Sequence, residues 1–308
     1  MIADYEPPSF QAIARAISES GLRLSERTIR RYHLSLQASD FVVLSGPSGS
    51  DKTWLATRYG EVVGAETLLV AVAPSWTTNE DLLGSFDPLA KTYRHTSFSR
   101  FLIAAAKEYQ DAEARGRTAR PFHLILDEMN RAPVEYYFAK LLAAMDVRAR
   151  NGTAEVDLSE TESVLLTPNL KFIGTVSIDE ATHAFAGKVY DLAQLIEISV
   201  ERDEIFAHLT GRPYREALMN VWDIMLPVAP FAYRVLDEMS TYLDAAIALE
   251  RPWEDALDEQ LLQKVLPKIK GTDLAVGSAL QEFVLLAQNQ WPLSEAMAGE
   301  MLTNLRRT

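Results

Sequence analysis

Eight consecutive residues have the types and the spacing of a phosphate-binding loop. They are Gly46, Pro47, Ser48, Gly49, Ser50, Asp51, Lys52 and Thr53, between an apolar run and a helix-forming stretch. Except at its sixth position, the loop fits the Walker A pattern G-x-x-x-x-G-K-[ST]. Backbone N–H groups and a helix N-terminus then cradle phosphates, the lysine reaches the β and γ oxygens, and the hydroxyl binds Mg²⁺. Lys52 and Thr53 are in place for the last two roles.

Asp51 stands where the pattern has its second glycine. Glycine is used there because the backbone approaches the phosphates closely, in a conformation that a side chain hinders. Aspartate tolerates unusual backbone angles better than most residues, but its carboxylate would lie beside a polyphosphate. Like charges in close contact cost on the order of 1 kcal/mol or more. We therefore expect Asp51 to weaken nucleotide binding.

A pair of carboxylates follows another apolar run. Phe122 to Leu126 reads as a strand, and Asp127 and Glu128 come directly after it. Downstream of a phosphate-binding loop, such a pair is typical of a Walker B motif, in which Asp127 holds Mg²⁺ and Glu128 orients and polarises the attacking water. The sequence thus predicts Mg²⁺ and ATP as ligands, and it leaves GTP possible.

Alternating strands and helices are needed to position these motifs. Strand-like apolar runs occupy residues 41–45, 67–73, 122–126, 172–176 and 194–200. Strands separated by helical stretches favour an α/β fold with a five-stranded parallel sheet that is covered on both faces. The dipeptide Asn151-Gly152, in a polar stretch between Met145 and Pro168, predicts the tight turn of a hairpin that projects from the sheet.

Helices are expected on either side of this core. Phe10, Ile13 and Ile17 recur at helical spacing, and Ser25 is the expected N-cap of a second helix. The two helices could form a DNA-reading helix-turn-helix or pack beside the nucleotide domain, and the strand that follows directly favours packing. Beyond residue 200 the patterns are helical. The predicted domains are residues 1–36 (N-terminal helices), 37–200 (P-loop NTPase α/β core) and 201–308 (helical domain).

Composition narrows the functions that are open to the chain. Its 308 residues are 48% hydrophobic, carry a net charge of −13 and include no cysteine. Disulfides, thiolate metal sites and a cysteine nucleophile are excluded. The negative charge disfavours nucleic-acid binding by the whole surface, so any DNA contact must be local; the basic clusters 27–31 and 115–120 are candidates, or simply solvated faces. No membrane-spanning run or signal peptide is recognisable, so we expect a cytoplasmic protein without a membrane partner.

The acidic motif and its surroundings resemble a known family. Residues 126–132, Leu-Asp-Glu-Met-Asn-Arg-Ala, and residues 134–138 resemble the Walker B region of the McrB-like branch of the AAA+ NTPases, the motor subunits of methylation-dependent restriction systems and their relatives. Further similar segments are 41–46, 76–84, 231–235 and 262–268. The resemblance implies the AAA+ fold with a C-terminal helical lid. It also implies a homo- or hetero-oligomeric ring, usually hexameric, that binds nucleotide between subunits.

The chain departs from that family at positions that serve hydrolysis. Segment 172–180 aligns with the fourth strand, where relatives carry a sensor asparagine in place of Ser177, and a serine lacks the amide donor. Leu192 replaces an arginine that acts across the subunit interface, and loss of such an arginine can remove about 10³ to 10⁵ in rate. Arg234 matches a second sensor in the lid. The resemblance therefore implies catalytic roles for Glu128, Ser177 and Arg234, with impaired hydrolysis.

Three functions remain open on this basis. The first is a motor subunit that partners a separately encoded nuclease or effector in restriction or phage defence, with possible DNA contact in the assembled ring. The second is a degenerate NTPase that acts as a scaffold or regulatory subunit. The third is a DNA-binding regulator that uses residues 9–36, which the acidic charge disfavours.

Segment 85–98 could form a hairpin facing the ring pore or a plain surface loop. Asn130 and Arg131 could couple neighbouring sites or cap a helix, and His183 is expected to be structural.

Overall fold

The computed structural model describes residues 4–160, 162–178 and 183–305, which form two compact units. The first unit comprises the chain up to Gly46 together with Asp51–Ile198. The second comprises Pro47–Ser50 and the residues from Ser199 onward. Residues 179 and 180, the end of the predicted fourth-strand segment, lie outside the described residues.

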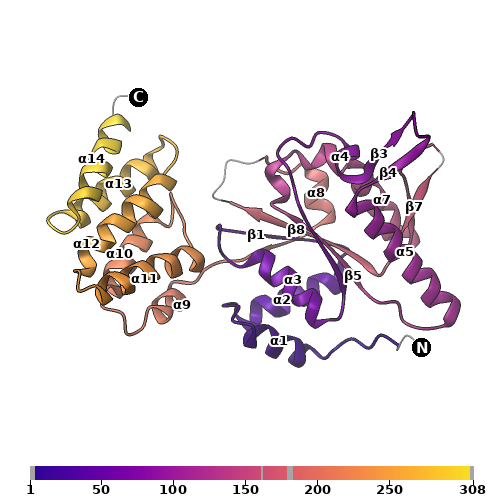
Figure 1. The fold of residues 1–308 in the computed structure, drawn as a ribbon, viewed down its shortest axis with the longest axis horizontal. Coiled ribbons are helices and arrows are strands. Elements are labelled where there is room, and N and C mark those ends of the chain that lie inside the picture. Colours follow the sequence, from indigo (N-terminus) through magenta and orange to yellow (C-terminus); the bar gives the residue numbers. More distant parts are fainter. Residues whose placement is uncertain (1–3, 161, 179–182, 306–308) are drawn as a thin grey trace. The chain divides into compact units, whose positions relative to one another are not determined.

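A five-stranded parallel sheet forms the centre of the first unit (Figure 1). The strands are β1 (Phe41–Gly46), β2 (Glu66–Ala71), β5 (Phe122–Asp127), β8 (Leu170–Ser177) and β9 (Gln194–Glu197). Their order is β2-β5-β8-β1-β9, and every neighbouring pair is parallel. The predicted α/β fold is thus confirmed. Each predicted run overlaps a strand, although β8 is longer and β9 is shorter than expected.

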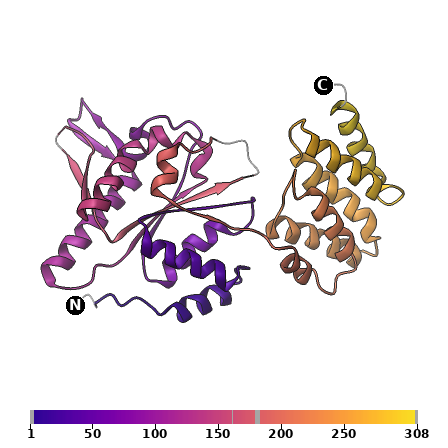
Figure 2. The ribbon, with the colours of Figure 1, turned by 180° about the vertical axis from the view of Figure 1, so that it is seen from behind.

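Helices cover both faces of the sheet (Figures 1 and 2). On one face lie α1 (Phe10–Glu19), α2 (Glu26–Ala38) and α3 (Lys52–Val62). On the other lie α5 (Ser97–Arg115), α7 (Ala139–Asn151) and α8 (Gly187–Leu192). Side chains of β1 alternate between the two cores, with Val42 and Leu44 in the first and Phe41 and Val43 in the second. Because both faces are buried, the strand reads as a continuous apolar run.

The N-terminal helices share the core of the sheet. Ile13, Ile17 and Ile29 are buried in the same cluster as Val42. The hydroxyl of Ser25 accepts the N–H of Thr28, so the predicted N-cap is confirmed. The helices therefore pack on the sheet, in agreement with the interpretation that they lie beside the nucleotide domain. One compact unit includes both the helices and the strands.

Two β-hairpins project from this unit. The first joins β3 (Gly84–Asp87) to β4 (Thr92–His95), between α4 (Asn79–Leu83) and α5, and the second joins β6 (Ala154–Asp157) to β7 (Ser163–Leu166). Segment 85–98 therefore begins with a hairpin. The Asn151-Gly152 prediction was wrong in detail, because Gly152, with φ of 81°, ends α7 and the hairpin turn lies further on. A glycine with positive φ is a common helix terminator.

Every regular element described in the second unit is a helix or a helical turn (Figure 1). Its helices are α9 (Arg202–His208), α10 (Arg215–Met225), α11 (Tyr233–Ala248), α12 (Trp253–Gln260), α13 (Leu274–Ala287) and α14 (Pro292–Leu305), with a π-turn, η2 (Leu261–Val265), and a 3₁₀ turn, η3 (Leu266–Lys268). Buried Asp258 accepts the N–H groups of Leu293 and Ser294, which satisfies the first turn of α14. Among the described helices of the whole chain, none is long and apolar enough to cross a membrane.

Candidate nucleotide-binding site

The phosphate-loop residues connect β1 to α3. Asp51 immediately precedes α3 and has φ of 60° and ψ of 20°, the left-handed conformation that favours glycine. An L-residue pays roughly 1–2 kcal/mol for this conformation, and aspartate is among the residues that tolerate it best. The backbone demand that we inferred from the glycine of the pattern is therefore present, and Asp51 meets it.

Lys52 lies within the fold of the loop. Its side chain is buried, and Nζ donates to the carbonyl oxygen of Gly46 at 2.9 Å. The hydroxyl of Ser50, also buried, donates to the carbonyl oxygen of Pro47 at 2.8 Å. The lysine is thus folded back along the loop, at the N-terminus of α3, where a helix favours anions.

A hydrogen-bonded cluster joins the loop to the acidic strand end. Thr53 Oγ1 donates to Asp127 Oδ1 at 2.6 Å, and Thr175 Oγ1 donates to the same oxygen at 2.7 Å. Thr175 Oγ1 also accepts the N–H of Glu128 at 3.0 Å. The fold therefore brings together Thr53 and Asp127, the two residues predicted to bind the metal.

Thr175 is the residue that sequence reasoning missed. It is buried in β8, and the register places Gly174 opposite Leu126, so Thr175 lies beside the end of β5. Its single hydroxyl orients the Asp127 carboxylate and fixes the backbone of Glu128. A polar residue in an otherwise apolar strand next to the acidic one is the signal that could have found it.

Glu128 sits at a sharp turn of the chain. Its φ of 51° and ψ of 53° are left-handed, a strained state that costs of order 1–3 kcal/mol and is common at functional sites. Its Oε2 lies 3.0 Å from Arg131 Nε across η1 (Met129–Arg131). A Cβ on Gly174 would lie 2.7 Å from Met129 Sδ, so a glycine there lets η1 approach β8 closely.

The remaining predicted residues lie in different surroundings. Ser177 is buried at the end of β8, opposite Gly46 in the register, so it adjoins the start of the loop. Leu192 ends α8 and packs on the core that covers the second face of the sheet. In the second unit, Arg234 of α11 donates from Nη2 to Ser48 Oγ at 2.9 Å. The backbone N–H of His183 donates to the carbonyl oxygen of Asn130 at 3.0 Å, a structural contact.

The donor set fits Mg²⁺ held together with a nucleotide. Among the described residues, no group of three or more His, Cys, Asp or Glu side chains could hold a metal ion. Magnesium in phosphate-transfer sites is bound by one or two protein oxygens plus phosphates and water, not by a dedicated protein cage. Thr53 and Asp127 would supply the oxygens for that mode, and Lys52 would supply the charge for the phosphates.

The loop, the acidic pair and the parallel sheet together define a P-loop NTPase domain. Residues 41–183 match the family model described as AAA domain (dynein-related subfamily), and residues 204–308 match that of a domain of unknown function, DUF8727. A search of curated proteins found no match. The chain therefore carries an AAA+ nucleotide-binding domain of the ATPase type, a class that binds ATP with Mg²⁺, and the predicted AAA+ core is confirmed.

Proposed function

We propose that this chain is a subunit of an McrB-like AAA+ ring that binds Mg·ATP and hydrolyses it slowly. The arrangement of the candidate nucleotide-binding site carries the proposal. Thr53 Oγ1 lies 2.6 Å from Asp127 Oδ1, and the neighbouring Lys52 is buried. Asp51 occupies the position of the same loop that requires a left-handed backbone and that the pattern gives to glycine. The binding groups are complete, and an added carboxylate opposes the phosphates.

Slow hydrolysis is supported by two further positions. Ser177, at the end of β8, offers a short hydroxyl where the resembling family has an amide that positions water. Leu192 has no charge with which to stabilise a transferring phosphoryl group in a neighbouring subunit. Both residues serve the chemical step, so we expect binding to suffer less than turnover.

A regulatory subunit without turnover is the second candidate. The carboxylate of Glu128 is paired with Arg131 at 3.0 Å, and this pairing competes with the orientation of an attacking water. If the pair persists with nucleotide bound, the chain acts as a nucleotide-dependent scaffold in a mixed ring. A nuclease or effector subunit, and any DNA contact, would then belong to that assembly.

Oligomerisation and hydrolysis of the purified full chain distinguish these functions. We would measure the oligomeric state by mass photometry, and the rate of phosphate release, with ATP and with GTP in parallel. A nucleotide-dependent ring with slow phosphate release supports the motor. A ring that binds ATP without release supports the scaffold, and a monomer that binds neither nucleotide overturns both.

Restoring the two departures tests the cause of slow turnover. The double variant Ser177→Asn/Leu192→Arg supplies the missing amide and the missing cation. We expect the rate of phosphate release from the assembled ring to rise at least tenfold, because an arginine that acts across the interface can raise the hydrolysis rate by a factor of about 10³ to 10⁵. Unchanged release from a correctly assembled ring would mean that these positions do not limit hydrolysis.

A further inference from the structure

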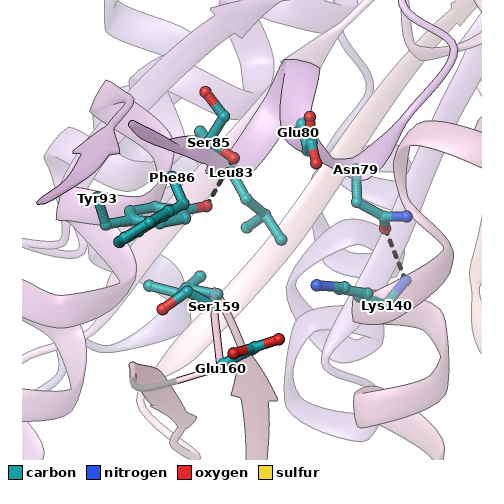
Figure 3. Close-up of a pocket in the computed structure, with 11 residues that line it drawn as sticks. Asn79, Glu80, Leu83, Ser85, Phe86, Tyr93, Lys140, Ser159 and Glu160 are labelled. Carbon is teal, nitrogen blue, oxygen red and sulfur yellow. Dashed lines mark hydrogen bonds between the residues drawn. The ribbon is translucent and has the colours of Figure 1, made fainter. Parts of the chain in front are cut away.

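A cavity of about 450 Å³ lies between the two projecting hairpins of the first unit (Figure 3). Its lining comes from α4, from both strands of the first hairpin, from the start of α7 and from the connection between β6 and β7. The volume is within the range of ligand-binding pockets in proteins. None of these residues takes part in the proposed nucleotide chemistry, so a role for the cavity is independent of the proposed function.

One wall of the cavity is aromatic. Phe86 and Tyr93 are directly opposite in the antiparallel register, which puts their rings on the same face of the hairpin. Tyr93 Oη donates to the carbonyl oxygen of Gly84 at 2.7 Å and so holds its ring in place. Phe86 leaves 49% of its surface exposed at the cavity, so its ring is accessible to a ligand. Buried Leu83 and Leu158 add further apolar lining.

The charged groups around this wall are mainly acidic. Glu80 and Glu160 line the cavity from opposite elements, as Figure 3 shows. Lys140 is the positive side chain of the lining, but its Nζ already donates to the carbonyl oxygen of Asp157 at 2.8 Å. The pKa of Tyr93 is raised by burial and then by the charges of Glu162 and Glu80. The cavity therefore combines π faces with negative potential.

Contacts between distant segments preform the cavity. Asn79 Oδ1 accepts the backbone N–H of Lys140 at 2.9 Å, which joins α4 to α7 (Figure 3). His95 Nε2 lies 3.0 Å from Glu162 Oε1, which joins the first hairpin to the second. A preformed site loses less conformational entropy on binding than one that must be ordered first.

We propose that this cavity binds basic side chains of an extended segment of a partner polypeptide. A lysine or arginine cation is attracted to the faces of Phe86 and Tyr93 and to the carboxylates of Glu80 and Glu160, while its aliphatic stem packs on the leucines. The hairpin favours a polypeptide as the carrier of these cations, because a two-stranded sheet presents strand edges to which an extended chain can pair. Alternate residues of such a chain point to the same face.

Fluorescence anisotropy with the full chain tests the proposal. The probe is a fluorescein-labelled heptapeptide, Gly-Arg-Ser-Arg-Ser-Arg-Gly, at 150 mM salt, where charges beyond about 8 Å are screened. We expect saturable binding that Glu80→Gln/Glu160→Gln and Phe86→Ala each weaken about tenfold. The control Glu254→Gln/Glu300→Gln makes the same change in net charge on exposed residues of the second unit and should leave binding unchanged.

Each other outcome overturns the proposal. Equal weakening by both glutamine pairs would mean that the probe responds only to net charge. Unaltered binding by Phe86→Ala, in a variant whose circular dichroism and thermal unfolding match the parent, would remove the aromatic wall from the site. Spermine that binds as tightly as the heptapeptide and displaces it would make the ligand a small polyamine instead of a polypeptide.

Discussion

Charged residues lie at both ends of the parallel strands of the central sheet, but their contacts differ. We call the side where the strands begin the amino edge and the side where they end the carboxyl edge. At the amino edge, Arg148 is 2% exposed, and its Nε lies 3.1 Å from Asp40 Oδ2, which also pairs with Lys171 at 2.7 Å. Arg148 Nη1 donates to the carbonyl oxygens of Thr167 and Leu170 as well. The charges of this edge therefore pair with one another, although Nη2 of the buried Arg148 has no hydrogen-bond partner among the described residues.

At the carboxyl edge, acidic side chains lie near the phosphate-binding loop. Asp127 accepts from two hydroxyls, and neither donor is charged. Asp51 directly precedes Lys52, and Asp127 accepts from Thr53. We propose that this arrangement serves a metal ion and phosphates. In our proposal the amino edge stabilises the fold, whereas the carboxyl edge binds ligand.

The largest effect is expected from Lys52→Ala at the carboxyl edge. Loss of charged hydrogen bonds to the β and γ phosphates should weaken the binding of fluorescent ATP about 100-fold. Thermal unfolding without nucleotide should hardly change. Lys171→Ala is the control at the amino edge, and it should retain full affinity; retained affinity in Lys52→Ala would refute the phosphate-loop assignment.

At the amino edge, Arg148→Met should act on stability alone. Asp40 keeps its pair with Lys171, but the buried carbonyl oxygens of Thr167 and Leu170 lose the donor Nη1, which we expect to cost about 2 kcal/mol in the free energy of unfolding. Urea unfolding measures that loss, and nucleotide affinity should stay unchanged. Arg150→Met on the same helix is the matched control, because its pair with Asp146 is exposed and worth less than about 1 kcal/mol. Equal losses in the two variants would contradict a special role for the buried pair.

The amino edge should also make stability depend on pH through His123. Burial, and then the charge of Lys171, lower the pKa of His123 from 6.5 to about 4. Between these values the unfolded chain binds more protons, so the free energy of unfolding falls as pH drops below 6.5, by about 2 kcal/mol at pH 5. We expect His123→Phe, which can keep the stacking on Tyr59, to lose this component in urea unfolding at pH 7 and pH 5. An identical pH dependence in both proteins would exclude His123 as its source.

A smaller effect is expected from Thr175→Val at the carboxyl edge. Without the hydroxyl, Asp127 loses one donor and the N–H of Glu128 loses its acceptor, so the Mg²⁺ concentration that supports half-maximal ATP binding should rise about tenfold. Thr175→Ser should restore the parent value, because it keeps the hydroxyl. A merely structural role would lower stability without moving the Mg²⁺ dependence.

Much of the fold could be predicted because its signals are local. The apolar run of β1 and the loop after it are consecutive in sequence, and strands alternate with helices along the core. The helical character beyond residue 200 is likewise visible as amphipathic periodicity. The turn at Asn151-Gly152 was misassigned because the same dipeptide can end a helix, and here Gly152 ends α7.

The candidate site could be predicted only in part. Lys52, Thr53 and Asp127 follow from motifs, whereas Thr175 depends on the register between β5 and β8, which no short pattern encodes. The pairing of Glu128 with Arg131 depends on the left-handed turn after β5. The lining of the cavity between the hairpins comes from three separate stretches of the chain, so the cavity appears only in three dimensions.

The most direct test of the account is the Mg·ATP affinity of three proteins: the parent, Asp51→Asn and Asp51→Gly. Asparagine keeps the shape and tolerates the left-handed backbone but removes the charge. If the carboxylate opposes the phosphates, both variants should bind about fivefold more tightly, which corresponds to about 1 kcal/mol. Affinity that rises only with glycine would assign the effect to backbone strain, and equal affinity in all three proteins would contradict our account of this loop.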